Sequence, residues 1–210
     1  MLGKPNTAVL KKILPLFSYV FHPIFIPVYA ALFYLFSNHS YFLTKEKYFV
    51  LLQVIILTIV LPIVFFLGLR STGKISSAMA PLISERKIPL VLQCFLIIFL
   101  IRRNITIERY PELHFFFLSA LLSTLIALIL LFAKMKVSLH MIGISALTFF
   151  VLGLNLHFQT QNTFLLVLLI FINGFVASSR LVMEAHTAKE LILGFLIGSV
   201  PQVLLMYLWL

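Results

Sequence analysis

The chain has 210 residues, of which 62% are hydrophobic and only 10% are charged, with a mean hydropathy of +1.13. A soluble domain carries about 45–50% apolar and about 25% charged residues, so this composition excludes an ordinary water-soluble protein. The net charge of +10 arises from 16 Lys and Arg against 6 acidic residues, all of them Glu. The basic residues stand mostly singly in short loops, which favours contact with a bilayer over a nucleic acid partner.

Long apolar runs recur along the chain, and most approach the length of about 20 residues that a helix needs to cross the hydrocarbon core. In chain order they predict seven spans, at about residues 15–37, 48–70, 88–103, 112–133, 138–156, 163–180 and 187–209. The third run is short for a span, and the period-two alternation typical of a membrane barrel is absent. The sequence therefore predicts an all-α polytopic membrane helical bundle of six to seven transmembrane helices, with residues 1–210 forming one integral membrane domain.

Three polar clusters interrupt the apolar pattern: SERKIP at 84–89, KVSLH at 136–140 and SSRLVMEAHTAKE at 178–190. Two predicted spans separate each cluster from the next. All three clusters are therefore expected on the same side of the membrane, where they can converge on a shared site. The positive-inside rule favours a cytoplasmic N-terminus, but most of the excess of basic residues lies in these clusters, so the orientation is left open.

The side chains of these clusters suit phosphate chemistry. Histidines can act as nucleophile and general acid near neutral pH, and arginine forks bind pairs of phosphate oxygens. His186 and Glu190 are four residues apart, so on a helix the carboxylate can reach the imidazole and fix its tautomer. Ser138 begins an apolar run, so the backbone amides of a helix N-terminus could hold an anion there. Metal-independent attack on a phosphate ester is predicted for the combined set: Arg86, Lys87, Lys136, Ser138, His140, Arg180, His186 and Glu190.

These residues resemble the motifs of the type-2 phosphatidic acid phosphatase superfamily. The third motif of that family, S-R-x5-H-x3-D, is similar to the segment 179–190, which has Glu190 in place of Asp. The second motif, P-S-G-H, is similar to the segment 137–140, which keeps Ser and His. The first motif, K-x6-R-P, is faintly similar to the segment ending at Pro89, with Met79 at the Lys position. The resemblance covers residues 84–198 and points to a compact bacterial branch of the superfamily.

The resemblance implies a role for each matching residue. His186 would be the nucleophile that forms a phosphohistidine, Glu190 would orient it, and His140 would protonate the leaving group. The phosphate would be bound by Arg180, Ser138, Arg86 and Lys136. The implied protein is a membrane lipid phosphatase of the bacterial cytoplasmic (inner) membrane, and its implied substrate is a phospholipid or an isoprenyl phosphate or diphosphate.

Residue types that are missing narrow the chemistry further. Asp is absent from the chain, and six scattered Glu do not supply the carboxylate cluster that a hard divalent cation needs. This excludes membrane transferases that hold magnesium diphosphate between paired aspartates. Cys94 is the only cysteine, so neither a disulfide framework nor a thiolate metal site is expected. We therefore expect no metal and no cofactor.

Other interpretations of the same residues stay open. Thr187 and Glu190 form a capping-box pattern, which could explain Glu190 with or without catalysis. The chain could be a catalytically inactive relative that binds or transports an anionic lipid, or a structural membrane subunit. His22 is expected to be a packing or interfacial residue at a kink, and His39, His114 and His157 are expected away from the clusters. Gly194 and Gly198 predict close helix packing, and a homodimer is left open.

Overall fold

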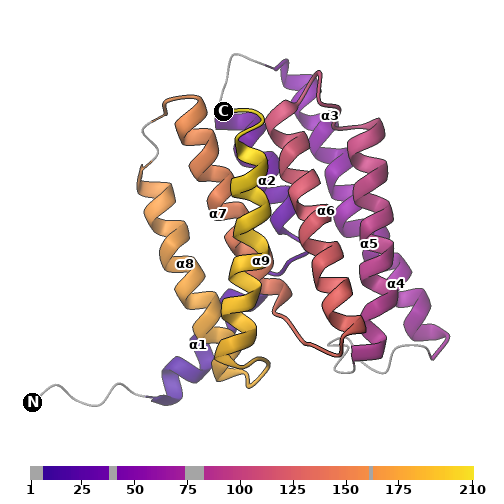
Figure 1. The fold of residues 1–210 in the computed structure, drawn as a ribbon, viewed down its shortest axis with the longest axis vertical. Helices are drawn as coiled ribbons and strands as arrows, with labels where there is room; N and C mark the ends of the chain where they lie inside the picture. The colour runs from indigo at the N-terminus through magenta and orange to yellow at the C-terminus, as the bar shows by residue number, and fades with distance from the viewer. Residues whose placement is uncertain (1–6, 38–41, 74–82, 161–162) are drawn as a thin grey trace, which may run out of the picture.

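The computed structural model describes residues 7–37, 42–73, 83–160 and 163–210, and every element within these ranges is a helix (Figure 1). The elements are α1 (Thr7–Val20), α2 (Ile26–Ser37), α3 (Thr44–Ile55), the π-helix η1 (Ile56–Val60), α4 (Leu61–Ser71), α5 (Ile83–Arg103), α6 (Pro111–Phe132), α7 (Leu139–His157), α8 (Thr163–Val182) and α9 (Ala188–Met206). The prediction of an all-α bundle is confirmed for the described part of the chain.

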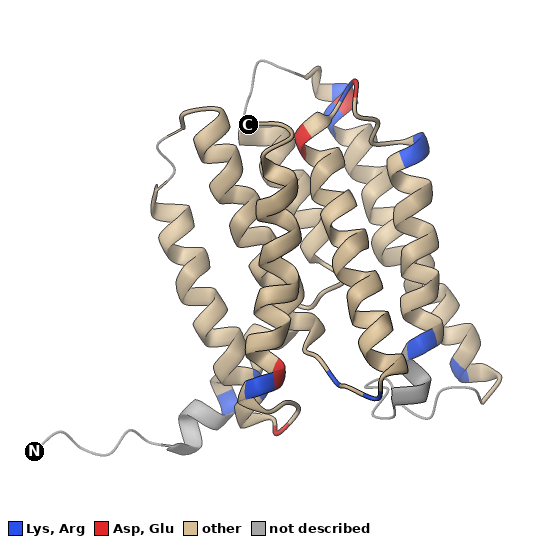
Figure 2. Ribbon diagram, viewed as in Figure 1, with Lys and Arg blue, Asp and Glu red and all other residues tan. Residues whose placement is uncertain are grey.

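Among the described residues, five helical segments are long and apolar enough to cross a membrane. They are the continuous α3–η1–α4 segment Thr44–Ser71, followed by α6, α7, α8 and α9. The charged residues gather at the two ends of the bundle, and the ribbon between these ends carries none (Figure 2). Head groups can solvate charges at such ends, while the hydrocarbon core accepts only the uncharged middle. The chain is therefore an integral membrane protein.

Neither of the two remaining predicted spans forms a single helix that is both long enough and apolar enough to cross a membrane. The first, at 15–37, is divided into α1 and α2 by an irregular segment at 21–25. The other, at 88–103, lies within α5, whose first turns carry charged residues and which ends in Arg102 and Arg103. This break and these charges explain why only five described segments are long and apolar enough by themselves, and the count of six to seven spans stays a prediction.

Helix α7 lies at the centre of the bundle and packs most closely on α9, with α2, α6 and α8 around it. Gly194 and Gly198 make this close packing possible. A Cβ atom at Gly194 would approach the Ser138 carbonyl oxygen to 2.7 Å, and one at Gly198 would collide with the Ile142 carbonyl oxygen. The predicted small-residue face is thus used within the chain, and it fixes the start of α9 against the start of α7.

Helix α1 packs along α8 at one end of the bundle (Figure 1). The rings of Phe17 and Phe175 stack with their centroids 4.7 Å apart. Deeper in the contact, the Ser18 and Ser179 hydroxyl oxygens share a buried hydrogen bond of 2.6 Å. These contacts bring the end of α1, and the segment that follows it, beside the last turn of α8.

The continuous segment Thr44–Ser71 changes its hydrogen bonding in the middle, at η1. Pro62 stands just beyond this π-helical turn, and it has no N–H group to donate to the preceding turn. The loss of that bond accounts for the wider turn between α3 and α4. Helix α4 then leaves most of its apolar side chains exposed, burying only Leu69.

Candidate functional site

Two of the three polar clusters meet at one end of the bundle. The Lys136 Nζ atom donates to the Ala185 carbonyl oxygen at 2.8 Å, and the Ser138 N–H donates to the Glu190 carbonyl oxygen at 3.4 Å. The first hydrogen bond joins the loop before α7 to the loop before α9, and the second joins it to the first turn of α9. The predicted convergence of residues 136–140 with residues 178–190 is thereby confirmed.

His186 and Glu190 form the closest polar pair of the site. The His186 Nδ1 atom lies 2.7 Å from the Glu190 Oε2 atom, and only 3% of the His186 side chain is exposed. The carboxylate can only accept, so Nδ1 carries the hydrogen and Nε2 keeps its lone pair. A histidine held in this tautomer can attack through Nε2.

The same carboxylate also caps helix α9. The Thr187 N–H donates to the Glu190 Oε2 atom at 3.3 Å, and the Glu190 N–H donates to the Thr187 Oγ1 atom at 3.4 Å. Thr187 is the N-cap residue, so His186 precedes the helix and does not lie on its face. The capping box is confirmed, and Glu190 orients His186 at the same time as it caps the helix.

The surroundings of His186 keep its imidazole neutral. Burial, together with the positive charges of Lys136 and Arg180, lowers the pKa of His186 from 6.5 to about 4, although the hydrogen bond that it donates to Glu190 and the charge of that carboxylate oppose the shift. Near pH 7 the side chain therefore carries one ring hydrogen. The neutral form is the one that a nucleophilic histidine requires.

His140 lies in the first turn of α7 and faces the end of α1. Its Nε2 atom is 3.1 Å from the Ser18 carbonyl oxygen, which can only accept, so Nε2 carries the hydrogen of the neutral ring. Nδ1 is then the atom of His140 that is available for proton transfer. The His22 ring stands almost perpendicular to the His140 ring, with the two centroids 5.1 Å apart.

Helix α8 contributes Arg180 to the site. It is half-buried in the last turn of that helix, where its Nη1 atom donates to the Met183 Sδ atom at 3.7 Å. It lines one cavity together with the imidazoles of His22, His140 and His186. A guanidinium at this position can bind an anion that reaches any of the three rings.

Some predicted phosphate ligands are engaged elsewhere in this structure. Ser138 is completely buried and caps α7, because its Oγ atom accepts from the Met141 N–H at 3.4 Å. Lys136 donates to a backbone carbonyl, as described above, and the Lys87 Nζ atom lies over the Phe132 ring at 4.5 Å from its centroid. The side chain of Arg86, like Met79, lies outside the described residues.

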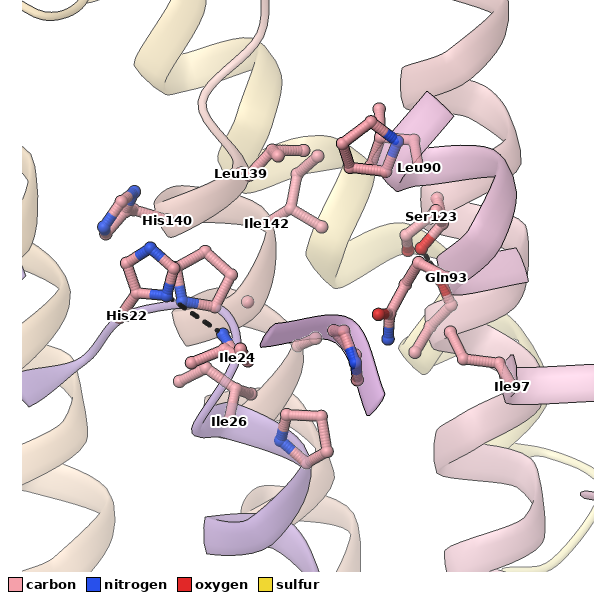
Figure 3. Close-up of a pocket in the computed structure, with 18 of the residues that line it drawn as sticks. His22, Ile24, Ile26, Leu90, Gln93, Ile97, Ser123, Leu139, His140 and Ile142 are labelled. Atoms are coloured by element: carbon pink, nitrogen blue, oxygen red, sulfur yellow. Dashed lines mark hydrogen bonds between the residues drawn. The ribbon is translucent and has the colours of Figure 1, made fainter. Parts of the chain in front are cut away.

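A cavity of about 490 Å³ opens between the site and the interior of the bundle. Its polar end is lined by His22, His140, Arg180 and His186. Pro89, the last residue of the first polar cluster, and the adjacent Leu90 also line the cavity. The rest of its wall is mostly apolar and comes from α2, α4, α5, α6 and α7. Figure 3 shows the two rings of His22 and His140 at one side, opposite Gln93 and Ile97 of α5.

Sequence reasoning missed His22 as a member of this site. His22 falls inside an apolar run, so it was expected to pack at a kink. In the structure the chain breaks there, and His22 is followed by Pro23 in an irregular segment that lines the cavity. The sequence signal was present in the pair His22-Pro23, since the residue before a proline is disfavoured in a helix.

The remaining histidines of the described chain lie at the opposite end of the bundle, as expected. The His114 Nδ1 atom is 2.6 Å from the Ile105 carbonyl oxygen, and the His157 Nε2 atom is 3.3 Å from the Glu112 Oε1 atom. His39 lies outside the described residues. Within the described ranges, no three His, Cys, Asp or Glu side chains are grouped so that they could hold a metal ion.

Comparisons with known proteins add no assignment to this geometry. No protein-family model matches the chain, and neither a curated protein nor a solved structure matches it significantly.

Proposed function

We propose that the protein is a membrane lipid phosphatase that releases phosphate without a metal ion, through a phosphohistidine at His186. The observation that supports this most directly is the cavity, because one end carries Arg180 and the oriented His186 while the rest is apolar. A ligand that fits both parts has an anionic head and a hydrocarbon tail. A lipid phosphate has this chemistry, and its phosphate stays at the membrane surface where the site lies.

In the first step the Nε2 atom of His186 attacks the phosphorus, and the bond from phosphorus to the leaving oxygen breaks. Glu190 holds the Nδ1 hydrogen and stabilises the positive charge that develops on the ring. The guanidinium of Arg180 balances the charge on the phosphoryl oxygens. His140 takes a proton at Nδ1 from the bound phosphate group, which enters as its monoanion, and gives that proton to the leaving oxygen.

In the second step water attacks the phosphohistidine. The Nδ1 atom of His140 has lost its proton by then, so it can take one from the water as the new oxygen–phosphorus bond forms. The nitrogen–phosphorus bond breaks, its electron pair returns to Nε2 of His186, and inorganic phosphate leaves. His140 passes the proton that it took from water to the departing phosphate, so one water is consumed in each cycle and both histidines return to their neutral starting states.

The proposal includes the arrangement of the chain in the membrane. The broken pair α1–α2 and the helix α5 run beside the five long apolar segments (Figure 1). We propose that both also cross the bilayer, which gives seven spans in a bacterial cytoplasmic membrane. The motif spacing at 179–190 and 137–140 further supports a relationship with the type-2 phosphatidic acid phosphatases.

The test is phosphate release by detergent-purified protein from lipid monophosphates and diphosphates, with EDTA present. We expect EDTA-resistant release by the wild type and its loss, by about a thousandfold or more, in His186→Ala. Lys189→Gln is the matched control, because Lys189 is exposed in the first turn of α9 beside Glu190. Release that survives in folded His186→Ala would exclude His186 as the nucleophile.

One observation favours a second candidate, an inactive protein that binds or moves an anionic lipid. Ser138 caps a helix and Lys136 holds a loop, so two expected phosphate ligands are engaged within the protein. A binder predicts that Arg180→Ala weakens lipid binding while His186→Ala does not. Turnover that depends on His186 would exclude this candidate.

A further inference from the structure

His22 forms a second histidine position beside His140, and the backbone holds both rings. The Ile24 N–H donates to the His22 Nδ1 atom at 3.3 Å, so the hydrogen of the neutral ring is on Nε2 (Figure 3). His140 is held by the Ser18 carbonyl oxygen at 3.1 Å. Both anchors belong to the end of α1 and the break that follows it. Backbone groups of the N-terminal segment therefore hold the two perpendicular rings in place.

The polar end of the cavity is a place for an anion. Its ionisable lining consists of three histidines and Arg180, and among the described residues that line the cavity none is a carboxylate. Glu190 contacts His186 from the side of the α9 helix cap. A group of hydrogen-bond donors with a guanidinium in a mostly apolar cavity favours a ligand with several anionic oxygens.

The three histidines share the polar end of the cavity. His22, His140 and His186 all line it together with Arg180. The His22 and His140 rings are in contact, with their centroids 5.1 Å apart. His22 is therefore the direct neighbour of the residue that is proposed to protonate the leaving group.

The contact with His140 assigns His22 to the leaving-group side of the reaction, because His140 is the residue that is proposed to protonate the leaving oxygen. A phosphoryl group is displaced in line, so the leaving oxygen stands opposite the attacking Nε2 of His186. His140 alone can supply the single proton that an alcohol needs on leaving. A second imidazole donor beyond His140 is useful when the leaving group carries anionic oxygens of its own.

We propose that His22 and His140 form a second phosphate subsite, and that the substrate is a lipid diphosphate whose hydrocarbon tail lies in the apolar part of the cavity. This inference rests on the proposed phosphatase function. The bond from the terminal phosphorus to the bridging oxygen breaks as His186 Nε2 bonds to that phosphorus. The lipid monophosphate leaves with the bridging oxygen and accepts the His140 proton, and water then releases inorganic phosphate from His186.

The test compares farnesyl diphosphate with farnesyl monophosphate, which share one tail, in the wild type, His22→Ala and His22→Gln. We expect His22→Ala to lower kcat/KM for the diphosphate about tenfold or more, the effect of one hydrogen bond to a charged group, and to change the monophosphate value less than about threefold. His22→Gln keeps an N–H donor, so it should restore most of the diphosphate activity. Tyr19→Ala, at an exposed position on α1, is the control for damage to the N-terminal segment.

A binding measurement separates this inference from the proposed function. Inorganic pyrophosphate should raise the Tm of the wild type more than inorganic phosphate does, and His22→Ala should remove that difference. Selective pyrophosphate binding without hydrolysis would support the subsite and overturn the phosphatase. Hydrolysis that responds equally to His22→Ala with both lipids, or to neither, would overturn the subsite and leave the phosphatase. If the protein shows neither selective pyrophosphate binding nor hydrolysis, both the subsite and the phosphatase function are overturned.

Discussion

Each end of the bundle holds a histidine–carboxylate pair. At one end the His186 Nδ1 atom lies 2.7 Å from Glu190, and at the other the His157 Nε2 atom lies 3.3 Å from Glu112. Glu112 also accepts a hydrogen bond of 2.8 Å from the Tyr34 hydroxyl group, so it ties together α2, α6 and α7. The pair of His157 and Glu112 is thus a connection between helices.

The difference between the two pairs lies in what surrounds them. His157 packs beside Trp209, with the ring centroids 5.6 Å apart. His186 instead lines a cavity together with Arg180, and its pairing nitrogen is Nδ1, which leaves Nε2 for chemistry. A histidine–carboxylate pair by itself therefore does not identify a reactive site. The cavity and the positive charge beside the ring are what distinguish His186.

The largest expected effect compares the two carboxylates directly. Glu190→Gln should lower kcat by about a hundredfold or more, because the amide no longer stabilises the charged imidazole. Glu112→Gln should leave turnover per folded molecule within about threefold of the wild type. Phosphate release normalised to the folded fraction measures both variants. Equal losses in the two would remove the distinction between the pairs.

An effect of intermediate size concerns stability. Glu112→Gln should lower the free energy of unfolding by about 1–3 kcal/mol, since a buried carboxylate loses its partner at His157 and weakens its bond to Tyr34. Thermal unfolding in detergent, followed by size-exclusion chromatography, measures the change. An unchanged Tm would show that the connection between α2, α6 and α7 does not contribute to stability.

The pH dependence of kcat/KM and of stability should further distinguish His186 from an ordinary histidine. The pKa of His186 is lowered to about 4, so kcat/KM should stay high as the pH falls through 6.5 and decline only toward pH 4. The stabilising contribution of the neutral ring is complete above about pH 6.5 and is lost between pH 6.5 and 4, because the unfolded chain binds the proton first. Lys136→Met removes a charge that lowers this pKa, so it should move the acid limb to higher pH. A limb at pH 6.5 in the wild type would contradict the prediction.

The smallest effect is expected at the exposed ion pair of the far end. Arg109 donates from Nε and Nη2 to the two Glu46 oxygens at 2.7 and 2.6 Å, but its side chain is 54% exposed. Arg109→Gln should lower Tm by about 2 °C or less, because surface ion pairs contribute little. The difference should vanish in about 1 M salt. A larger, salt-independent loss would show that this contact is structurally important.

Local features of the fold and site could be predicted from sequence. Apolar runs mark most of the helices because a bilayer demands about 20 residues of unbroken hydrocarbon. The contact of His186 with Glu190 and the capping box of Thr187 depend on spacings of three and four residues, which the helix start alone determines. The shared side of the clusters 136–140 and 178–190 follows from counting spans.

Features that depend on long-range packing could not be predicted in this way. His22 meets His140 because a chain break and the packing of α1 on α8 bring together residues more than a hundred positions apart. The burial of Ser138 depends on how closely Gly194 lets α9 approach. The sequence by itself determined the helices and the pair of His186 and Glu190, since these obey local spacing. Only the tertiary structure placed His22 in the site and formed the cavity, because both depend on the packing of segments from distant parts of the chain.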